Sequence, residues 1–288
     1  MKLLATGGQG QLGRALARRA PVLGHAIAAL DRTALDICDA RQIEAALDAH
    51  VPAAVINAAA YTGVDRAEQE RDAAHAINAV APGVLAAACA RRSIALVHLS
   101  TDYVFDGALR RPYREDDSIA PLGVYGATKA AGERAVIAAG GVVLRTSWLF
   151  SATGHNFVKT IVRLAIERRE LRVVADQHGC PSCADDIADA AIGLAERATA
   201  GAALESIYHA AGAGPTTWHG LACAIVETAR TRRTPACERV VPITTAEYPT
   251  PARRPANSVL DTTRIRALGI EMPPWLTGLE RVIAAIGG

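Results

Sequence analysis

The sequence predicts an α/β protein with a doubly wound parallel sheet and a smaller C-terminal lobe. Short apolar runs alternate with longer segments of helical periodicity up to residue 146, which is the pattern of βαβ units. A glycine-rich loop follows the first apolar run directly. The chain has 288 residues, of which half are hydrophobic and 21% are charged, so it can form a large core in one or two domains.

The first half of the chain supplies most elements of the predicted sheet. Each expected strand is an uninterrupted apolar run, as strands buried on both faces are. Strands are expected at Lys2–Thr6, Ala26–Leu30, Ala53–Ala58, Ile94–Ser100 and Val142–Thr146, and helices at Gln11–Ala20, between an N-cap at Asp39 and His50, at Ala73–Arg92 and at Tyr125–Ala139. Residues 1–147 are therefore assigned to the main domain.

The regular alternation weakens after Thr146. Helices are expected at Asn156–Arg169, Asp185–Arg197 and Leu221–Arg230, strands at Leu171–Val174 and Ser206–Ala210, and loops from Thr231 to Pro255. Residues 148–288 are assigned mainly to a substrate-binding lobe, with the provision that some late segments return to the main sheet.

Composition and charge argue against several classes of protein. The net charge is +2 and no basic stripe stands out, so a nucleic-acid binder is not expected. No apolar run approaches the roughly 20 residues that span a bilayer, and Gly7 and Gly8 come too early for a secretory signal. A cytoplasmic protein without membrane contact is expected. Cys180 and Cys183 form a CxxC pair without a second pair, and we interpret them as structural thiols.

The loop after the first strand has the pattern of a dinucleotide site. Gly7, Gly10 and Gly13 are spaced as GxxGxxG, which allows a tight turn and brings a helix N-terminus to a diphosphate. Such a loop is typical of a Rossmann-type fold. The second strand leads to Asp31, whose carboxylate can accept hydrogen bonds from the adenosine ribose. Arg32 can instead pair with a 2′-phosphate, so NADH and NADPH both stay open.

Tyr125 and Lys129 are the candidate reacting pair. They lie four residues apart near the start of a predicted helix and therefore project from one face. A neighbouring ammonium favours the phenolate and eases proton exchange by a tyrosine. Only three of the 31 basic residues are lysines, so lysine at this position is expected to serve as a compact ammonium rather than as a generic charge.

Small and hydroxyl side chains follow the third and fourth predicted strands. Ala58, Ala59 and Ala60 leave room for a dinucleotide to lie close to the backbone. Thr101, with Ser100 beside it, can donate to a carbonyl oxygen on which negative charge grows during reduction. Because ligands of such sheets bind beyond the carboxyl ends of the strands, we expect these residues in one crevice.

These motifs together resemble the extended short-chain dehydrogenase/reductase superfamily, and within it most closely the dTDP-4-dehydrorhamnose reductases. The similarity is carried, in order along nearly the whole chain, by residues 57–65, Ser100–Phe105, 145–148, 154–157, 216–219 and 248–255. The resemblance implies reduction of the 4-keto group of dTDP-4-dehydro-β-L-rhamnose to dTDP-β-L-rhamnose, with NADPH or NADH as cofactor and a dTDP-sugar as the binding partner.

The resemblance also implies roles for individual residues. Tyr125 would donate the proton, Lys129 would hold the nicotinamide ribose and tune Tyr125, and Thr101 would contact the keto group. The implied cofactor site comprises Gly7, Gln9, Gly10, Gln11, Leu12, Gly13, Asp31, Arg32, Asp36, Ile37, Ala58, Ala59, Ala60, Tyr125 and Lys129. The implied substrate site comprises Val64, Thr101, Asp102, Tyr103, Trp148 and Asn156. A core position for Trp148 and a capping role for Asp36 remain as alternatives.

The first predicted helix departs from the family pattern. Some bacterial members dimerise through magnesium held by acidic residues, one of them early in this helix. Here Ala15 offers no oxygen ligand, although Asp185 remains at a second matching position. Magnesium is therefore doubtful, no metal site is predicted, and a monomer or weak homodimer is expected.

Two other kinds of function stay open. One is a nucleotide-sugar 4,6-dehydratase or 4-epimerase of the same superfamily. A dehydratase is disfavoured because its threonine precedes Asp-Glu, whereas Thr101 precedes Asp102 and Tyr103, and an epimerase would carry bound NAD. The other is a non-catalytic regulatory subunit resembling that of methionine adenosyltransferase, which would copurify with a synthetase and show no turnover.

Overall fold

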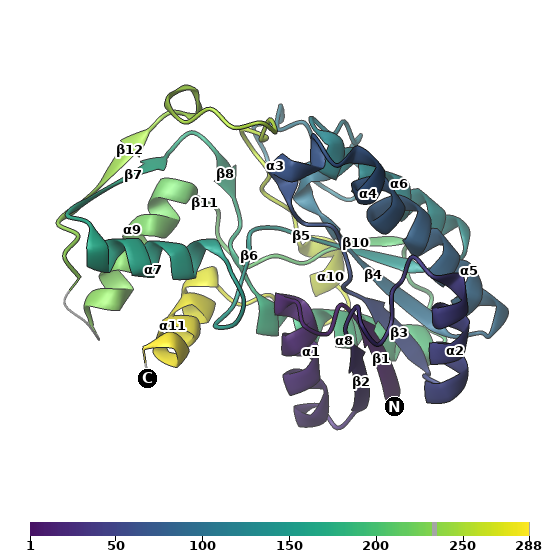
Figure 1. Cartoon of the computed structure of the whole chain (residues 1–288). Coiled ribbons are helices and arrows are strands. Elements are labelled where there is room, and N and C mark those ends of the chain that lie inside the picture. Colours follow the sequence, from purple (N-terminus) through teal and green to yellow (C-terminus); the bar gives the residue numbers. More distant parts are fainter. Residues whose placement is uncertain (232–234, 288) are drawn as a thin grey trace.

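The computed structural model describes residues 1–231 and 235–287 and shows a larger and a smaller lobe (Figure 1). The larger lobe contains a six-stranded sheet in the order β10-β5-β4-β3-β1-β2, and every neighbouring pair is parallel. The chain starts with β1, adds the edge strand β2 on one side of it, and then builds outward on the other side with β3, β4, β5 and finally β10. The predicted doubly wound parallel sheet is confirmed.

The strands match the predicted apolar runs closely. They are β1 (Lys2–Thr6), β2 (Ala26–Leu30), β3 (Ala54–Asn57), β4 (Ala95–Thr101), β5 (Val142–Thr146) and β10 (Ile207–His209). β3 is one residue shorter than predicted at each end. At its C-terminal end, the alanines that follow Asn57 no longer pair with a neighbouring strand. β10 is the late strand, and it returns to the main sheet by pairing with β5.

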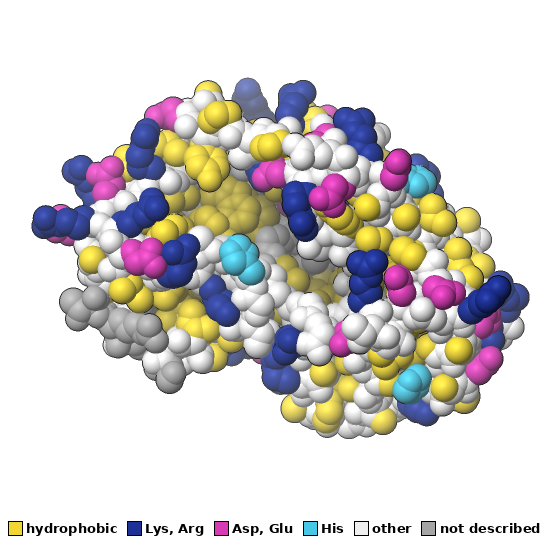
Figure 2. Space-filling model, in the orientation of Figure 1, with side chains coloured by type: hydrophobic (Ala, Val, Ile, Leu, Met, Phe, Trp, Pro, Cys, Tyr) yellow, Lys and Arg dark blue, Asp and Glu magenta, His cyan; other side chains and the backbone are white. Residues whose placement is uncertain are grey.

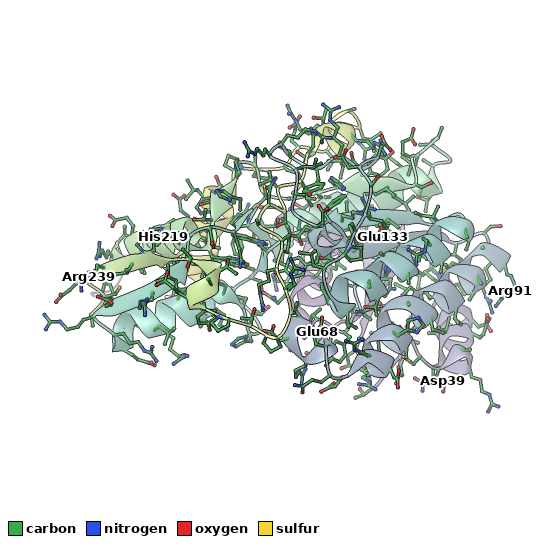
Figure 3. All side chains as sticks on the ribbon, turned by 90° about the horizontal axis from the view of Figure 1, so that it is seen from above. Asp39, Glu68, Arg91, Glu133, His219 and Arg239 are labelled. Carbon is green, nitrogen blue, oxygen red and sulfur yellow. The ribbon has the colours of Figure 1, made fainter. Side chains whose placement is uncertain are left out.

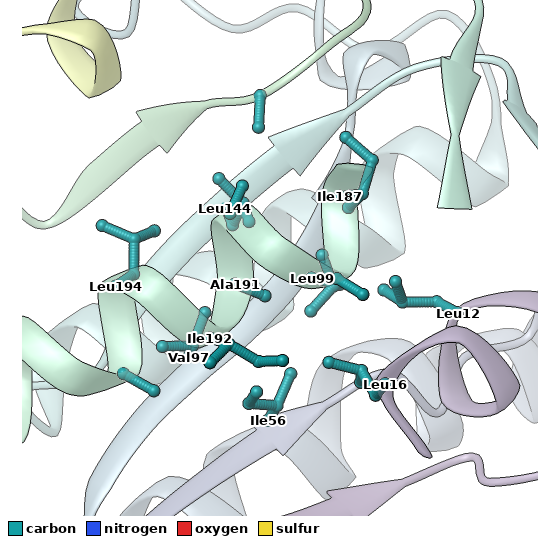
Figure 4. Packing of buried hydrophobic residues seen from close by; sticks show 14 of the residues in the cluster. Leu12, Leu16, Ile56, Val97, Leu99, Leu144, Ile187, Ala191, Ile192 and Leu194 are labelled. Atoms are coloured by element: carbon teal, nitrogen blue, oxygen red, sulfur yellow. The ribbon is translucent and has the colours of Figure 1, made fainter. Parts of the chain in front are cut away.

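Helices cover both faces of the sheet. On one face lie α1 (Gln11–Val22) and α8 (Ala184–Thr199), whose Leu16 and Ile192 pack with Ile56 and Val97 of the sheet (Figure 4). On the other face lie α2 (Ala40–His50), α5 (Ala81–Arg91) and α6 (Val124–Ala138). Successive residues of β1 alternate between the two clusters, so each strand is apolar along its whole length. The predicted N-cap is present, because the Asp39 carboxylate accepts from the Arg41 amide.

The predicted helix Ala73–Arg92 contains a break that periodicity did not indicate. It is a run of α4 (Arg71–His75), a π-helical turn η1 (Ala76–Val80) and α5. The π turn places Asn78 so that its side chain accepts from the Tyr61 amide at 2.8 Å and donates to the Tyr61 carbonyl at 3.0 Å. The run Arg71–Arg91 is long and apolar enough to cross a bilayer, but half of its most apolar window is buried, as in a core helix.

The smaller lobe has its own hydrophobic cluster. It contains α7 (Phe157–Glu167), α9 (Trp218–Arg230) and α11 (Trp275–Ile286), with the paired strands β7 (Glu170–Val174) and β12 (Arg239–Ile243), β8 (His178–Gly179) and β11 (Thr216–Thr217), and β6 (Leu149–Phe150) and β9 (Ser182–Cys183). Shorter elements are α3 (Val64–Ala67), η2 (Asp102–Val104), η3 (Thr245–Glu247) and α10 (Thr263–Arg266).

The prediction of loops from Thr231 to Pro255 is wrong for β12 and η3, while residues 232–234 lie outside the described part of the chain. β12 forms because β7 offers it a parallel partner from Arg239 to Ile243, and a partner strand distant in sequence is not visible in local composition. The division of the chain at residues 147 and 148 stays a prediction, although α8 and β10 lie with the large lobe.

The CxxC cysteines are free thiols that belong to different clusters. Cys180 packs with Phe105 and Tyr113, whereas Cys183 packs against α11 in the smaller lobe. Burial raises the pKa of both thiols, that of Cys180 to about 11. Thiols held protonated in this way are poor nucleophiles.

Candidate active site

A cleft of about 890 Å³ runs between the lobes, beyond the carboxyl ends of the central strands. Figure 2 shows the surface hollowed between the lobes, with hydrophobic side chains along part of its wall. Of the predicted site residues, those that line it are Gly7, Gln9, Gly10, Gln11, Leu12, Asp31, Arg32, Asp36, Ile37, Ala58, Ala59, Ala60, Val64, Thr101, Asp102, Tyr125, Lys129, Trp148 and Asn156. Gly13 and Tyr103 do not line it. The fold therefore gathers residues from six separate stretches of chain into one crevice.

The glycine loop is packed so closely at Gly7 and Gly13 that side chains are excluded there. Gly7 has a φ of +68°, and a Cβ there would lie 2.9 Å from the Ala59 amide nitrogen. A Cβ on Gly13 would lie 2.2 Å from the Gly7 carbonyl oxygen, which explains why Gly13 supports the loop from below rather than facing the cleft. The loop leads into α1, and the N-cap Gly10 and the first helical residues Gln11 and Leu12 line the cleft, so the positive end of the helix dipole lies at it. This cradle fits a dinucleotide diphosphate.

Gly10→Asp is expected to weaken NADPH and NADH binding at least about tenfold, or ~1.4 kcal/mol, while the fold is retained. A Cβ at this exposed position meets only the Gly7 carbonyl, at 3.2 Å, and aspartate is a good N-cap. The carboxylate would, however, occupy the place of the diphosphate charge. Calorimetric titration of each cofactor measures the effect, with the nearly isosteric but uncharged Gly10→Asn as control. Equal affinities of the two variants would contradict the placement.

The end of β2 holds the residues expected to meet the adenosine ribose. The Asp31 carboxylate accepts from the Thr33 amide at 3.0 Å and the Thr33 hydroxyl at 2.7 Å, and these hydrogen bonds lower its pKa. Arg32 is exposed and lies 3.5 Å from Asp36. Asp36 also accepts from the Cys38 amide at 3.0 Å, so this side chain both faces the cleft and caps a local turn.

Thr101 and Tyr125 meet where β4 ends and α6 begins. The Thr101 hydroxyl donates to Asp102 Oδ1 at 3.0 Å and accepts from the Tyr103 amide at 3.1 Å. Burial raises the pKa of Asp102 to about 7 and that of Tyr125 to about 12. A hydrogen bond with Thr101 opposes the shift of Tyr125, and the Asp102 carboxyl adds to it. Tyr125 is therefore a phenol at neutral pH and can act as an acid.

The Lys129 side chain is buried and bonded to the end of β4. Its Nζ donates to the Leu99 carbonyl at 2.6 Å and lies 3.2 Å from His98 Nε2. Burial lowers the pKa of Lys129 to about 8. Both contacts hold Nζ toward β4 in the cofactor-free protein. That Lys129 holds the nicotinamide ribose and tunes Tyr125 stays a prediction.

Lys129→Arg is expected to lower kcat/KM by about 10²-fold or more and to weaken cofactor binding. Lys129 is only 2% exposed, and a planar guanidinium is too large for the space between the Leu99 carbonyl and His98. Steady-state kinetics and cofactor titration measure the change. Lys2→Arg, the same substitution at an exposed position, should leave both unchanged. Near-normal kcat/KM in Lys129→Arg would show that any cation suffices here.

The smaller lobe contributes an aromatic wall. Trp148, with a φ of +45°, stacks on Trp218 with ring centroids 3.6 Å apart and planes 8° apart. A Cβ on Gly179 would lie 2.4 Å from the Trp148 ring, so the residue beneath the ring has no room for a side chain. Trp148 lines the cleft and also packs against the hydrophobic cluster of the small lobe. Its position is therefore compatible with both the substrate-site role and the core role considered for it. Trp218 was missing from the predicted site, although it lies in the family-like segment 216–219.

The remaining predicted substrate residues have partners within the protein. Asn156 Nδ2 donates to Gln11 Oε1 and to the Ser151 carbonyl, both at 2.8 Å, and thereby links α7 to the cofactor loop. The Tyr103 ring contacts the edge of Tyr125 at a centroid distance of 5.9 Å. Tyr103 lines a smaller pocket with Tyr125 and Val64 instead of the main cleft.

The two positions considered for magnesium ligands hold a buried alanine and an aspartate in an ion pair. Ala15 is fully buried between α1 and the sheet, and Asp185 forms an ion pair with Arg18 at 2.7 Å. In residues 1–231 and 235–287, no group of three or more histidine, cysteine or acidic side chains is placed to hold a metal ion.

Comparisons with known proteins agree with this architecture over the whole chain. The profile of the RmlD substrate binding domain family matches residues 1–287. A dTDP-4-dehydrorhamnose reductase from Burkholderia thailandensis is 47% identical over 96% of this chain and 95% of its own, and one from Aggregatibacter actinomycetemcomitans is 44% identical over 98% of both. The crystal structure of the reductase from Bacillus anthracis in complex with NADP is 36% identical, with a TM-score of 0.91 over 98% of both chains.

Proposed function

The chain belongs to the family of dTDP-4-dehydrorhamnose reductases, and on this premise we propose how its residues reduce dTDP-4-dehydro-β-L-rhamnose. It is an NAD(P)H-dependent oxidoreductase of dTDP-rhamnose biosynthesis. The predicted enzyme class and cofactor class are confirmed. Relatives of this identity favour the reductase over the dehydratase, the epimerase and the non-catalytic subunit.

The chain's own residues would provide the acid and the oxyanion donor. When bound, the dinucleotide supplies the hydride that is added to the sugar C4. Tyr125 gives its phenolic proton to O4, so the phenol O–H bond breaks as the alcohol O–H bond forms. The Thr101 hydroxyl donates to the same oxygen while its negative charge grows. Trp148 and Trp218 cover the small-lobe side of the cleft and keep water from the reacting atoms.

One observation carries this proposal. Tyr125, whose pKa desolvation raises to about 12, lines the cleft together with the strand-end Thr101 and the glycine cradle. A reduction needs the tyrosine in its protonated form, and burial keeps it so.

Following the oxidation of NADPH and NADH at 340 nm tests the function. The 4-keto sugar nucleotide would be made in situ from dTDP-glucose by the two upstream enzymes. We expect stoichiometric oxidation of the reduced cofactor and formation of dTDP-rhamnose. Protein that retains NAD on purification and causes no net oxidation would instead identify an epimerase.

We also propose a cytoplasmic enzyme that acts as a monomer or weak homodimer without magnesium. Treatment with EDTA is expected to leave both activity and mass unchanged, because Ala15 has no ligand atom and Asp185 is paired with Arg18. Activity assays and light scattering before and after chelation measure this. Loss of activity or of a dimer that magnesium restores would contradict it.

A further inference from the structure

The side chain of Gln11, the first residue of α1, is bonded to the smaller lobe. Its Oε1 lies 2.8 Å from Nδ2 of Asn156, the N-cap of α7, which is 145 residues further along the chain. Both residues line the cleft. The mechanism above uses neither side chain. Because Gln11 follows the glycine cradle directly, the group that holds its side chain affects how the cofactor diphosphate is bound.

The orientation of the Asn156 amide is fixed by the backbone of α7. The Lys159 amide, which can only donate, points at Asn156 Oδ1 at 3.0 Å. The other terminal atom is therefore Nδ2, and it donates to the Ser151 carbonyl and to Gln11, both at 2.8 Å. An amide nitrogen has two protons, and these two acceptors use both of them.

The Gln11 amide is fixed in turn. An atom that accepts from Asn156 Nδ2 has to be the oxygen, so Oε1 faces the smaller lobe. The Ser151 hydroxyl lies 3.0 Å from the same oxygen and 2.6 Å from the Thr153 carbonyl, and its one proton can serve either without changing this assignment. Among the described residues, no acceptor meets the two N–H groups of Gln11 Nε2. The cradle therefore has a pair of unused donors beside its helix N-terminus.

The segment that leads into α7 packs closely on this contact. Gly154 has a φ of +71°, and a Cβ there would lie 3.2 Å from Gln11 Cγ, so a side chain would press on Gln11. Asn156 is only 6% exposed. Because packed contacts of this kind transmit displacement, a shift of the start of α7 has to move the Gln11 side chain with it.

We propose that Asn156 is a positioning residue for the cofactor: by holding Gln11 Oε1 it leaves both Nε2–H groups free for the dinucleotide diphosphate, and it ties the smaller lobe to the cofactor cradle. The inference rests on the proposed function in so far as a dinucleotide and a dTDP-sugar share the cleft. Diphosphate oxygens that accept from Nε2 restrain Gln11 and, through Asn156, the start of α7. Because the wall of Trp148 and Trp218 belongs to the same lobe, each ligand should bind more tightly when the other is present.

Asn156→Ser removes the donor and keeps the helix cap, because serine is an equally good N-cap. Calorimetric titration should show NADPH affinity about tenfold weaker, since the hydrogen bond from Gln11 to a charged group loses its orientation. Gln11→Ala should weaken it at least as much. In Gln11→Ala/Asn156→Ser, the second substitution should add less than about twofold, because the side chain through which Asn156 acts is gone. Unchanged affinity in Asn156→Ser, or a full further loss in the double variant, would refute the proposal.

Binding of dTDP tests the link between the lobes. This nucleotide has no keto group, so it can be titrated beside NADPH without turnover. In the unsubstituted protein, we expect dTDP to bind at least about fivefold more tightly with NADPH present than without it. In Asn156→Ser this ratio should fall toward one. Equal dTDP affinities with and without NADPH in the unsubstituted protein would overturn the coupling.

Asn257→Ser is the matched control. Asn257 also donates from Nδ2 to backbone carbonyls of a distant segment, those of Leu109 and Arg111, but it does not line the cleft. Its substitution should leave both NADPH affinity and the dTDP ratio unchanged. If Asn156→Ser failed to fold, Asn156→Asp would replace it, because aspartate caps helices equally well. Its acceptor would draw Gln11 Nε2 toward the smaller lobe, so NADPH affinity should fall at least about tenfold.

These titrations separate the inference from the proposed function. They are made without the 4-keto substrate, so failure of the 340 nm assay would count against the proposed function and leave the result standing. If dTDP did not bind at all, the proposed substrate would be wrong, while the NADPH titrations of the single and double variants would still decide the role of Asn156.

Discussion

Tyr125→Phe is expected to lower kcat by about 10²–10⁴-fold while NADPH and NADH still bind, because the ring stays and only the transferable proton is lost. In the unsubstituted enzyme, the pKa of about 12 keeps the acid protonated through the alkaline range. Loss of kcat from ionisation of Tyr125 should therefore begin only as the pH approaches that value. The 340 nm assay over a pH series measures both effects.

Tyr61→Phe is the matched control, because the Tyr61 hydroxyl is bonded to Glu70 at the surface. That variant should keep normal kcat. If Tyr125→Phe also kept normal kcat, the proton would have to come from another group, and the protonated form of Asp102 beside Thr101 would be the next to test.

Glu133→Ala is expected to destabilise the fold by about 3–5 kcal/mol. Glu133 and Arg145 are each 2% exposed and joined by two hydrogen bonds, and Figure 3 shows Glu133 inside the large lobe, away from the exposed Arg91. Removing the carboxylate leaves a guanidinium buried without its counter-charge. Urea denaturation of both proteins measures the difference.

The control for this prediction is an exposed ion pair on the same lobe. Glu44→Ala removes the partner of Arg91 and Arg92 at the surface and should cost less than about 1 kcal/mol. Similar losses in the two variants would mean that the burial of the Glu133–Arg145 pair carries no special penalty.

Much of the fold could be predicted because its signals are local. The strands β1, β2 and β5 end where their apolar runs end, and the N-cap of α2 depends on one aspartate and the amide next to it. The glycine spacing could be interpreted for the same reason, since a turn, a close backbone approach and a helix start lie within seven residues. The motifs that resemble the reductase family then indicated where along the chain the site residues lie.

What the sequence did not show depends on partners that are distant along the chain. β12 forms only because β7 lies beside it, and the π turn in the long helix exists where Asn78 binds Tyr61 across a loop. Trp218 reaches the cleft because it stacks on Trp148, 70 residues earlier.

The sequence by itself determined that Lys129 follows Tyr125 by one helical turn, and therefore that both side chains face one crevice. Only the tertiary structure decided what the lysine meets there. The parallel register of β1, β3 and β4 lines up Thr6, Asn57 and His98, which are 41 or more residues apart, and His98 lies 3.2 Å from Nζ. The partners of a buried amine shift its pKa, and they are placed by strand pairing rather than by neighbours in sequence.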